Sequence, residues 1–222
     1  TNMEHLRMPI DPQLLTLTQW LSPAFPTGAF AYSHGLETAV RTGRVKDATG
    51  LSDWLAGLMS HGTGRNDAVW IALAYDAPTP GALVQYDDQA RAFAGSAERQ
   101  REGSRQGQAF AQTVTQVWGH DVPNVMLPLA VGAAARAQGL DLISTIAVYL
   151  QNFLSALVSA AQRLLPLGQT QAQKVLAMHA QTCLDLADTT PGQSFDDLHN
   201  TAFLSDICAM QHETLQPRLF QS

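Results

Sequence analysis

The stretch Leu51–Met59, which reads LSDWLAGLM, decides the fold class. Its apolar side chains recur at intervals of three and four residues, which places them on one face of an α-helix rather than alternating across a strand. The same spacing returns elsewhere, at Leu14, Leu17 and Leu21 and at Phe110, Val114 and Val117. The sequence therefore predicts amphipathic helices at several places along the chain.

The composition of the chain supports a wholly helical fold. Alanine and leucine occur 32 and 28 times, whereas the strand formers valine and isoleucine occur 12 and 5 times. Glycine and proline separate the helical stretches, for example at Gly62 and at Pro166–Gly168. No segment between helices is long enough to link two domains. We predict an all-α, single-domain bundle of about eight to ten helices over residues 1–222, with a flexible N-terminus at 1–10.

Two helix boundaries are predicted from local signals. Gly119 and Pro123 end a long helix that begins near Ala90. A capping-box variant over residues 194–197, which reads SFDD, is expected to start the last helix.

The charge of the chain restricts its partners. It carries 13 lysines and arginines against 19 aspartates and glutamates, for a formal charge of -6. This balance argues against a protein that binds nucleic acid or an anionic membrane. Two cysteines, Cys183 and Cys208, cannot form a disulfide framework and suit a reducing compartment, which predicts a cytoplasmic protein.

One apolar segment is long enough to cross a bilayer. Residues 142–162 contain no charged side chain. A thin polar stripe nevertheless follows one side of this segment at helical spacing, formed by Ser144, Gln151, Ser155, Ser159 and Gln162. Such a stripe is typical of the central helix of a soluble bundle, so we predict no membrane span.

The motifs of the common catalytic sites are missing from the sequence. Neither lysine, Lys46 or Lys174, follows a glycine, so no phosphate-binding P-loop is present, and there is no G-x-S-x-G nucleophile elbow. Ser33, His34 and Glu37 could be assembled into a triad on paper. Neighbouring side chains on a helix point about 100° apart, however, so the hydroxyl and imidazole would not meet. These absences argue against a nucleotide-hydrolysing enzyme or a serine hydrolase, and an enzyme of unknown chemistry in a helical pocket stays an alternative.

Two His/Cys pairs have a spacing that could bind a metal ion. His179 and Cys183 stand four residues apart, as do Cys208 and His212, and two facing pairs would give a tetrahedral site. Because the first pair lies among apolar residues and cysteine is commonly buried, simple packing is the favoured interpretation.

An arginine-rich stretch extends from Arg91 to Arg105. Glu98 and Glu102 alternate with its arginines at the i+3 and i+4 spacing of helical ion pairs. We expect a solvated helix face, and the alternative is a docking face for an acidic partner or a nucleotide.

The last residues are unusually apolar. Residues 212–222 read HETLQPRLFQS, whereas chain ends that fray are commonly small and polar. Leucine, arginine and phenylalanine here predict a segment that docks, either on its own domain or on a partner.

Three blocks of sequence resemble one known family. Residues 21–37 read LSPAFPTGAFAYSHGLE, residues 165–170 read LPLGQT, and the end of the chain contains HET at 212–214 and RLF at 218–220. These blocks, in this order, resemble the urease accessory protein UreF family, whose first signature ends near FPVGGFSYSHGLE. The chain departs from the family pattern at Thr27 and Ala29, and in the last block at Gln216–Pro217 and Gln221.

The resemblance implies an all-helical, non-catalytic protein that forms homodimers. Such proteins bind UreD, called UreH in some organisms, and recruit the GTPase UreG to apo-urease. The assembly couples GTP hydrolysis to nickel delivery and supports carbamylation of the active-site lysine, and the UreF-type subunit itself holds no stable cofactor. The resemblance also implies that residues 213–222 form a tail that docks on a partner.

The residues that the resemblance assigns to partner surfaces fall into three groups. One partner or dimer surface is formed by Pro26, Gly28, Phe30, Ser33, His34, Gly35 and Glu37. Arg101 and Arg105 are candidates for contact with UreG. The UreD contact is anchored by Arg218, Leu219 and Phe220, and His212 and Glu213 are further partner-binding candidates. The alternative function is a direct nickel-binding metallochaperone that uses His179, Cys183, Cys208 and His212 as ligands. The absence of a His-rich tract argues against that alternative.

Overall fold

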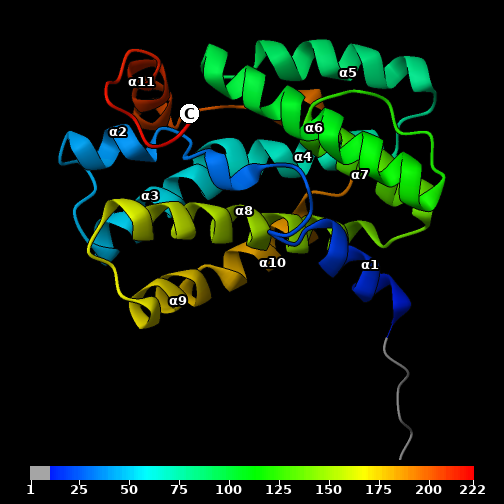
Figure 1. Ribbon diagram of the computed structural model, residues 1–222. Helices are drawn as coiled ribbons and strands as arrows, with labels where there is room; N and C mark the ends of the chain where they lie inside the picture. Colours follow the sequence, from blue (N-terminus) through cyan, green and yellow to red (C-terminus); the bar gives the residue numbers. More distant parts are fainter. Residues whose placement is uncertain (1–10) are drawn as a thin grey trace, which may run out of the picture.

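The computed structural model describes residues 11–222, and within that range it is built from helices and loops without a strand (Figure 1). The all-α prediction is confirmed. The expectation of a flexible N-terminus at 1–10 lies outside the described residues. The α-helices of the described range are α1 Pro12–Trp20, α2 Leu36–Arg41, α3 Ala48–His61, α4 Thr63–Tyr75, α5 Pro80–Ala92, α6 Ala97–Trp118, α7 Leu127–Gln138, α8 Leu142–Leu164, α9 Gln169–Met178, α10 Ala180–Thr189 and α11 Phe203–His212.

These eleven helices of the described range exceed the predicted eight to ten by one, because α9 and α10 are interrupted by a single residue. The backbone of His179 closes α9 and opens α10. Two short 3-10 turns, η1 Ala29–Ala31 and η2 Phe195–Asp197, complete the regular structure.

Helix α3 forms as its sequence predicts. The Asp47 side chain accepts a hydrogen bond from the Gly50 N–H at 2.9 Å and so caps the helix. The apolar face predicted from the spacing is buried, namely Leu51, Trp54, Leu55, Leu58 and Met59. Apolar periodicity therefore identified both the helix and its core-facing side.

Helix α8 lies across the middle of the bundle, between α3 and α4 on one side and α9 and α10 on the other (Figure 1). By length and composition it is the single helix of the described range that could cross a membrane. Here it packs against α2, α4, α7, α9 and α10, and its apolar residues from Ile146 to Val158 enter the common core. Its place in the structure is that of a core helix, as the polar stripe predicted.

The predicted long helix from Ala90 to Gly119 is two helices. Ala90 belongs to α5, and α6 begins anew at Ala97, where the Ser96 hydroxyl accepts a hydrogen bond from the Arg99 N–H at 3.2 Å. This N-cap starts a new helix at Ala97, a boundary that the sequence prediction overlooked. The C-terminal boundary at Gly119 is confirmed.

The capping box at residues 194–197 is present, but it opens the 3-10 turn η2 rather than the last helix. Helix α11 begins six residues later, at Phe203, and packs against α2 and α6. After α11, residues 213–222 turn back along the molecule toward α2 and α6, where the chain ends (Figure 1). We call residues 213–222 the tail segment.

Candidate partner-binding site

The tail segment is held by the carboxylate of Glu37, which projects from the second position of α2 and is almost completely buried. One carboxylate oxygen accepts the N–H of Leu219 at 2.8 Å, and the other accepts the N–H of Phe220 at 2.9 Å. Burial alone would raise the pKa of Glu37, but these backbone hydrogen bonds and His212 hold it below its usual value. Glu37 is therefore an ionised anchor for the tail backbone.

A second buried carboxylate, that of Glu98 at the start of α6, binds the side chain of Arg218 in the tail segment. Arg218 donates to one oxygen of Glu98 at 2.5 Å, and Nδ1 of His212 lies 2.7 Å from the other. The opposite ring nitrogen of His212, Nε2, lies 3.2 Å from Glu37. His212 thus joins the two carboxylates that hold the tail segment.

Hydrogen bonds to the backbone of residues 31–33 hold the last two residues of the tail segment. The Gln221 N–H donates to the Ala31 carbonyl at 2.8 Å, and both the N–H and the hydroxyl of Ser33 donate to the Ser222 carbonyl, at 2.9 and 2.5 Å. The Ser222 hydroxyl donates to Glu102 at 2.8 Å. The tail segment therefore lies against the loop from η1 to α2, in the 21–37 block.

The loop that receives the tail segment depends on a glycine. Gly35 has a φ of +76°, and a Cβ at this position would lie 2.8 Å from the backbone nitrogen of Ala209. A side chain here would therefore be strained and would also push α11 away from α2. The preceding residue, His34, also has a positive φ, 53°. This tight turn places Ser33 and Glu37 on the same side, facing the tail segment.

Beneath the tail segment a polar network continues into the bundle. Nε2 of His34 lies 2.8 Å from Glu102, whose other oxygen is paired with Arg99. Burial on its own would raise the pKa of Glu102, but the Arg99 charge, with His34, holds it at about 2. Burial, reinforced by Arg99, lowers the pKa of His34, so its ring is neutral at pH 7 and Arg99 is the main charge partner of Glu102.

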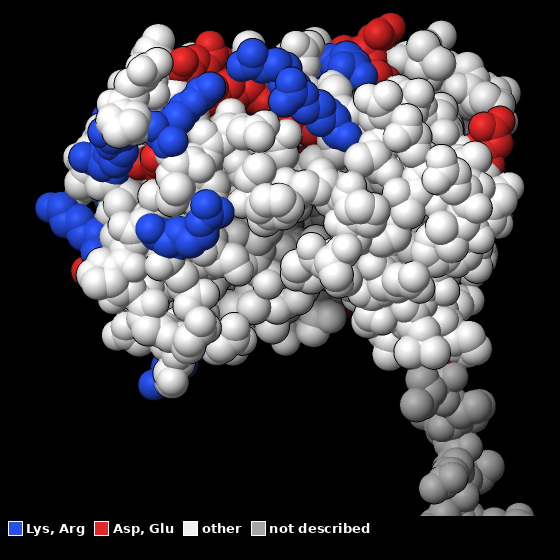
Figure 2. All heavy atoms as spheres, viewed as in Figure 1, with Lys and Arg blue, Asp and Glu red and all other residues white. Residues whose placement is uncertain are grey.

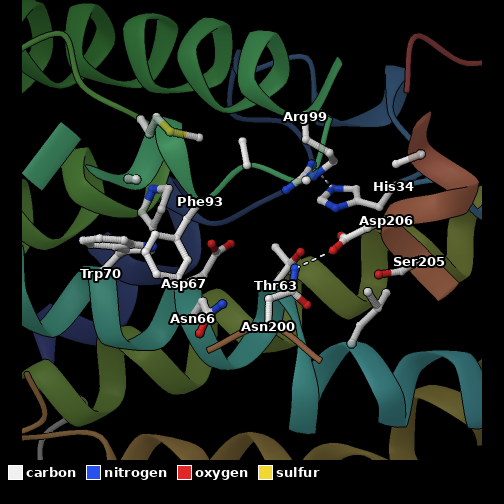
Figure 3. Close-up of a pocket in the computed structure, with 17 residues that line it drawn as sticks. His34, Thr63, Asn66, Asp67, Trp70, Phe93, Arg99, Asn200, Ser205 and Asp206 are labelled. Atoms are coloured by element: carbon white, nitrogen blue, oxygen red, sulfur yellow. Dashed lines mark hydrogen bonds between the residues drawn. The ribbon is translucent and has the colours of Figure 1, made fainter. Parts of the chain in front are cut away.

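A small cavity of about 60 Å³ lies below this network, between α4, α6 and α11 (Figure 3). His34 and Arg99 line one end of the cavity, Trp70 and Phe93 line the other, and Asp206 accepts a hydrogen bond from Asn200 at 2.7 Å. Nδ1 of His34 is buried without a hydrogen-bond partner among the described residues.

Asp67 on α4 also lines this cavity (Figure 3). It accepts a hydrogen bond from the hydroxyl of Tyr149 at 2.7 Å. Burial raises the pKa of Asp67 to about 6, although the Arg99 charge and the Tyr149 hydroxyl oppose the shift.

Comparison with known proteins identifies the family. A sequence model described as UreF matches residues 45–180, more than half of the chain. The chain is 44% identical to the urease accessory protein UreF of Ruegeria pomeroyi over 214 residues, which cover 96% of this chain and 99% of that relative. It is 46% identical to the UreF of Roseobacter denitrificans over 208 residues, 94% of this chain and 93% of that protein. The chain belongs to the UreF family. Its relatives are named as accessory proteins, so this UreF-family chain is an accessory protein rather than an enzyme.

The structure brings most of the fourteen predicted partner-surface residues together at the tail segment, but it buries five of them. The buried ones contact other parts of this chain, and they are Ser33, Gly35, Glu37, His212 and Phe220. His34 is nearly buried, and Gly28 is partly exposed with a φ of +73°. The residues on the surface are Pro26, Phe30, Arg101, Arg105, Glu213, Arg218 and Leu219.

The expectation of a solvated helix face is wrong for Glu98 and Glu102. Both are 2% exposed, and Arg99 between them is mostly buried. A signal was available, because the positions 98, 102, 106, 110 and 114 form one stripe with four-residue spacing that is buried throughout in α6. Its first three members are polar, and so the stripe resembled a surface. Asp67 and Tyr149 carried no such signal in the sequence.

The two His/Cys pairs of the nickel-binding alternative are not brought together. Nε2 of His179 lies 3.1 Å from the Ser52 hydroxyl, and the Cys183 thiol lies 3.8 Å from Gln151. Cys208 and His212 lie on α11, which packs against α2 and α6 instead. Over residues 11–222 no group of three or more His, Cys, Asp or Glu side chains has the arrangement of a metal site. The structure therefore assigns none of the four as a metal ligand.

Proposed function

We propose that this UreF-family chain is a urease maturation scaffold. It binds a UreD/UreH-type protein, recruits a UreG-type GTPase to apo-urease, and so couples GTP hydrolysis to nickel delivery. Nickel is the cargo of the assembly, and this subunit supplies contact surfaces rather than chemistry. We place the complex in the cytoplasm, in keeping with two free cysteines, and we propose that the scaffold acts as a homodimer.

The observation that carries the proposal is a cluster of exposed arginines around the docked tail segment. We call it the arginine cluster, and it consists of Arg41, Arg101, Arg105, Arg163 and Arg218. Figure 2 shows positively charged side chains gathered over the end of the molecule that carries α2, α6 and α11. A concentration of positive charge on a chain of net charge -6 favours a partner with an acidic surface.

Arg101 and Arg218 of the arginine cluster pair with Glu98, whereas the other three arginines contact neutral acceptors. Arg41 donates to the Pro217 carbonyl, Arg105 lies 3.3 Å from the Gln221 side-chain oxygen, and Arg163 donates to the Phe30 carbonyl at 3.1 Å. All three acceptors are neutral. These arginines hold the tail segment and its loop in place while their charge stays available to an acidic partner.

Apolar side chains lie next to the arginine cluster. Phe30 is 75% exposed and Leu219 is 53% exposed, whereas Phe220 is buried under the guanidinium of Arg163, which lies 4.3 Å from the ring centre. An exposed aromatic ring and a leucine flanked by arginines match the composition of protein interaction sites. In this proposal Leu219, Arg218 and Phe30 touch the UreD-type partner directly, whereas Glu37, His212 and Phe220 hold the segment in position.

Charge reversal tests the proposal. We expect the double variant R101E/R105E to bind its UreD-type or UreG-type partner at least tenfold more weakly, because it reverses two charges beside the tail segment. The matched control is Lys174→Glu, which reverses an exposed charge on α9. Binding measured by interferometry at two salt concentrations should show weaker salt dependence for the double variant. Equal affinities for wild type and R101E/R105E with both partners would contradict the proposed surface.

A further inference from the structure

The cavity between α4, α6 and α11 is lined by polar groups whose hydrogen bonds the protein does not complete. The first is Arg99, which points into the cavity opposite Asp67 (Figure 3). Its Nη1 lies 3.0 Å from His34 and also binds Glu102. Its Nε and Nη2 donate to no atom of residues 11–222. Because a guanidinium has five N–H donors, Arg99 keeps donors for a further ligand.

The α4 side of the cavity has polar atoms without partners as well. Oδ2 of Asp67 accepts a hydrogen bond from Tyr149 at 2.7 Å, but Oδ1 accepts none from the described residues. Asn66 is 7% exposed, and its Oδ1 accepts the His199 N–H at 3.3 Å while its Nδ2 has no partner in the same range. None of these atoms is among the fully buried unpartnered atoms of residues 11–222, so each keeps surface that a small molecule can reach.

Arg99 and Asp67 act on each other across the cavity without direct contact. Burial raises the pKa of Asp67, and the Arg99 charge opposes that shift. Over residues 11–222, however, the ion pair of Arg99 is with Glu102, and none within 4.0 Å joins it to Asp67. Helices α4 and α6 both pack against α7, which holds the two charged groups on separate helices. A ligand between them must accept from Arg99 and donate to Asp67.

Water meets both requirements and fits the space. A volume of about 60 Å³ holds about two to four water molecules, and a buried water needs two to four polar partners. We propose that this cavity is a binding site for ordered water, which accepts from Arg99 and Asn66 and donates to Asp67. The bound water completes the hydrogen bonds of the arginine that pairs with Glu102 beneath the tail segment. The water site belongs to the isolated chain and does not depend on any partner.

A high-resolution crystal structure of the full-length chain under xenon pressure tests the site directly. Ordered water should lie within hydrogen-bond distance of both Arg99 and Asp67, and xenon should be absent from the cavity, because xenon enters dry apolar cavities. Xenon in the cavity, a cavity without ordered water, or a bound ion in place of water would overturn the proposal.

Nuclear magnetic resonance of the isolated chain gives an independent reading. The Nε–H of Arg99 should show laboratory-frame and rotating-frame Overhauser effects to water of opposite sign, which indicate a long-lived bound water. The double variant Asp67→Asn/Tyr149→Phe should keep these effects, because the amide oxygen still accepts from water. The matched variant Asp67→Leu/Tyr149→Phe should lose them, because leucine has a similar size but no acceptor.

Two results would contradict the water site in solution. One is the absence of opposite-sign effects at Arg99 in wild type, and the other is their full retention in Asp67→Leu/Tyr149→Phe. If the leucine variant does not fold, the wild-type spectrum and the crystal structure decide.

Discussion

At the scale of single residues, the buried acids of this protein fall into two kinds. Glu37, Glu98 and Glu102 each have a cationic or backbone donor partner, and the first and third have a pKa below the usual value. Asp67 has only the Tyr149 hydroxyl as a hydrogen-bond partner among the described residues, and burial raises its pKa. Ionised Glu37 and Glu102 therefore stabilise the fold, whereas ionised Asp67 opposes it.

The pKa of Asp67 leads to a prediction about stability. This pKa is about 6 in the folded chain, against an ordinary value of 3.8, so the folded state binds the proton more tightly. Stability is therefore lost as pH rises from about 4 to about 6, by up to about 3 kcal/mol. Asp67→Asn removes that penalty, since the amide oxygen can still accept from Tyr149. Urea denaturation at pH 7.5 should show a gain of about 1–3 kcal/mol.

The same measurement at pH 4 should show a gain below about 1 kcal/mol, because Asp67 is then largely protonated in the folded chain. Asp53→Asn, which neutralises an exposed carboxylate on α3, is the control and should change little at either pH. An equal gain at both pH values, or a loss at pH 7.5, would show that the ionised Asp67 does not oppose folding.

At the scale of secondary-structure elements, close helix contacts depend on glycines whose role the sequence did not reveal. A Cβ on Gly107 of α6 would lie 1.9 Å from the carbonyl oxygen of Val125, which precedes α7. Gly107→Ala should therefore destabilise the protein by about 1–3 kcal/mol or more, because the two backbones must separate. Thermal unfolding followed by circular dichroism measures the effect.

The matched control for that change is Gly57→Ala on α3. No atom lies within 4 Å of a Cβ built there, and alanine favours a helix over glycine by about 0.5–1 kcal/mol. Gly57→Ala should therefore raise the melting temperature while Gly107→Ala lowers it. Similar shifts for the two variants would mean that helix propensity, and not the α6–α7 approach, determines the result.

The elements also show what the sequence could predict. The core face of α3 and the place of α8 followed from apolar periodicity, which is a local property of the chain. The buried stripe of α6 was mispredicted because Glu98 and Glu102 have the spacing of surface ion pairs. Their partners in the tail segment and α11, which are Arg218, His212 and Ser222, lie more than a hundred residues away, and no local pattern encodes such contacts.

At the scale of the whole molecule, two segments that are far apart in the sequence, the 21–37 block and the tail segment, meet at one site. The 21–37 block and the tail segment contain two of the three blocks that carry the family resemblance, and the structure pairs Ser33 with Ser222 across 189 residues. In this chain the two segments are therefore the two sides of one contact. The arginine cluster surrounds that contact, while the rest of the bundle supports it.

The most direct test of the scaffold claim is co-expression of this chain with the UreD-type, UreG-type and urease proteins of the same source, followed by sizing. Wild type should yield a stable complex with the UreD-type and UreG-type proteins. Deletion of residues 217–222 should leave a folded chain that no longer joins the complex, because Leu219 and Arg218 are removed from the surface. Undiminished assembly of the folded deletion variant, or no association of folded wild-type partners in any nucleotide or nickel state, would contradict the account.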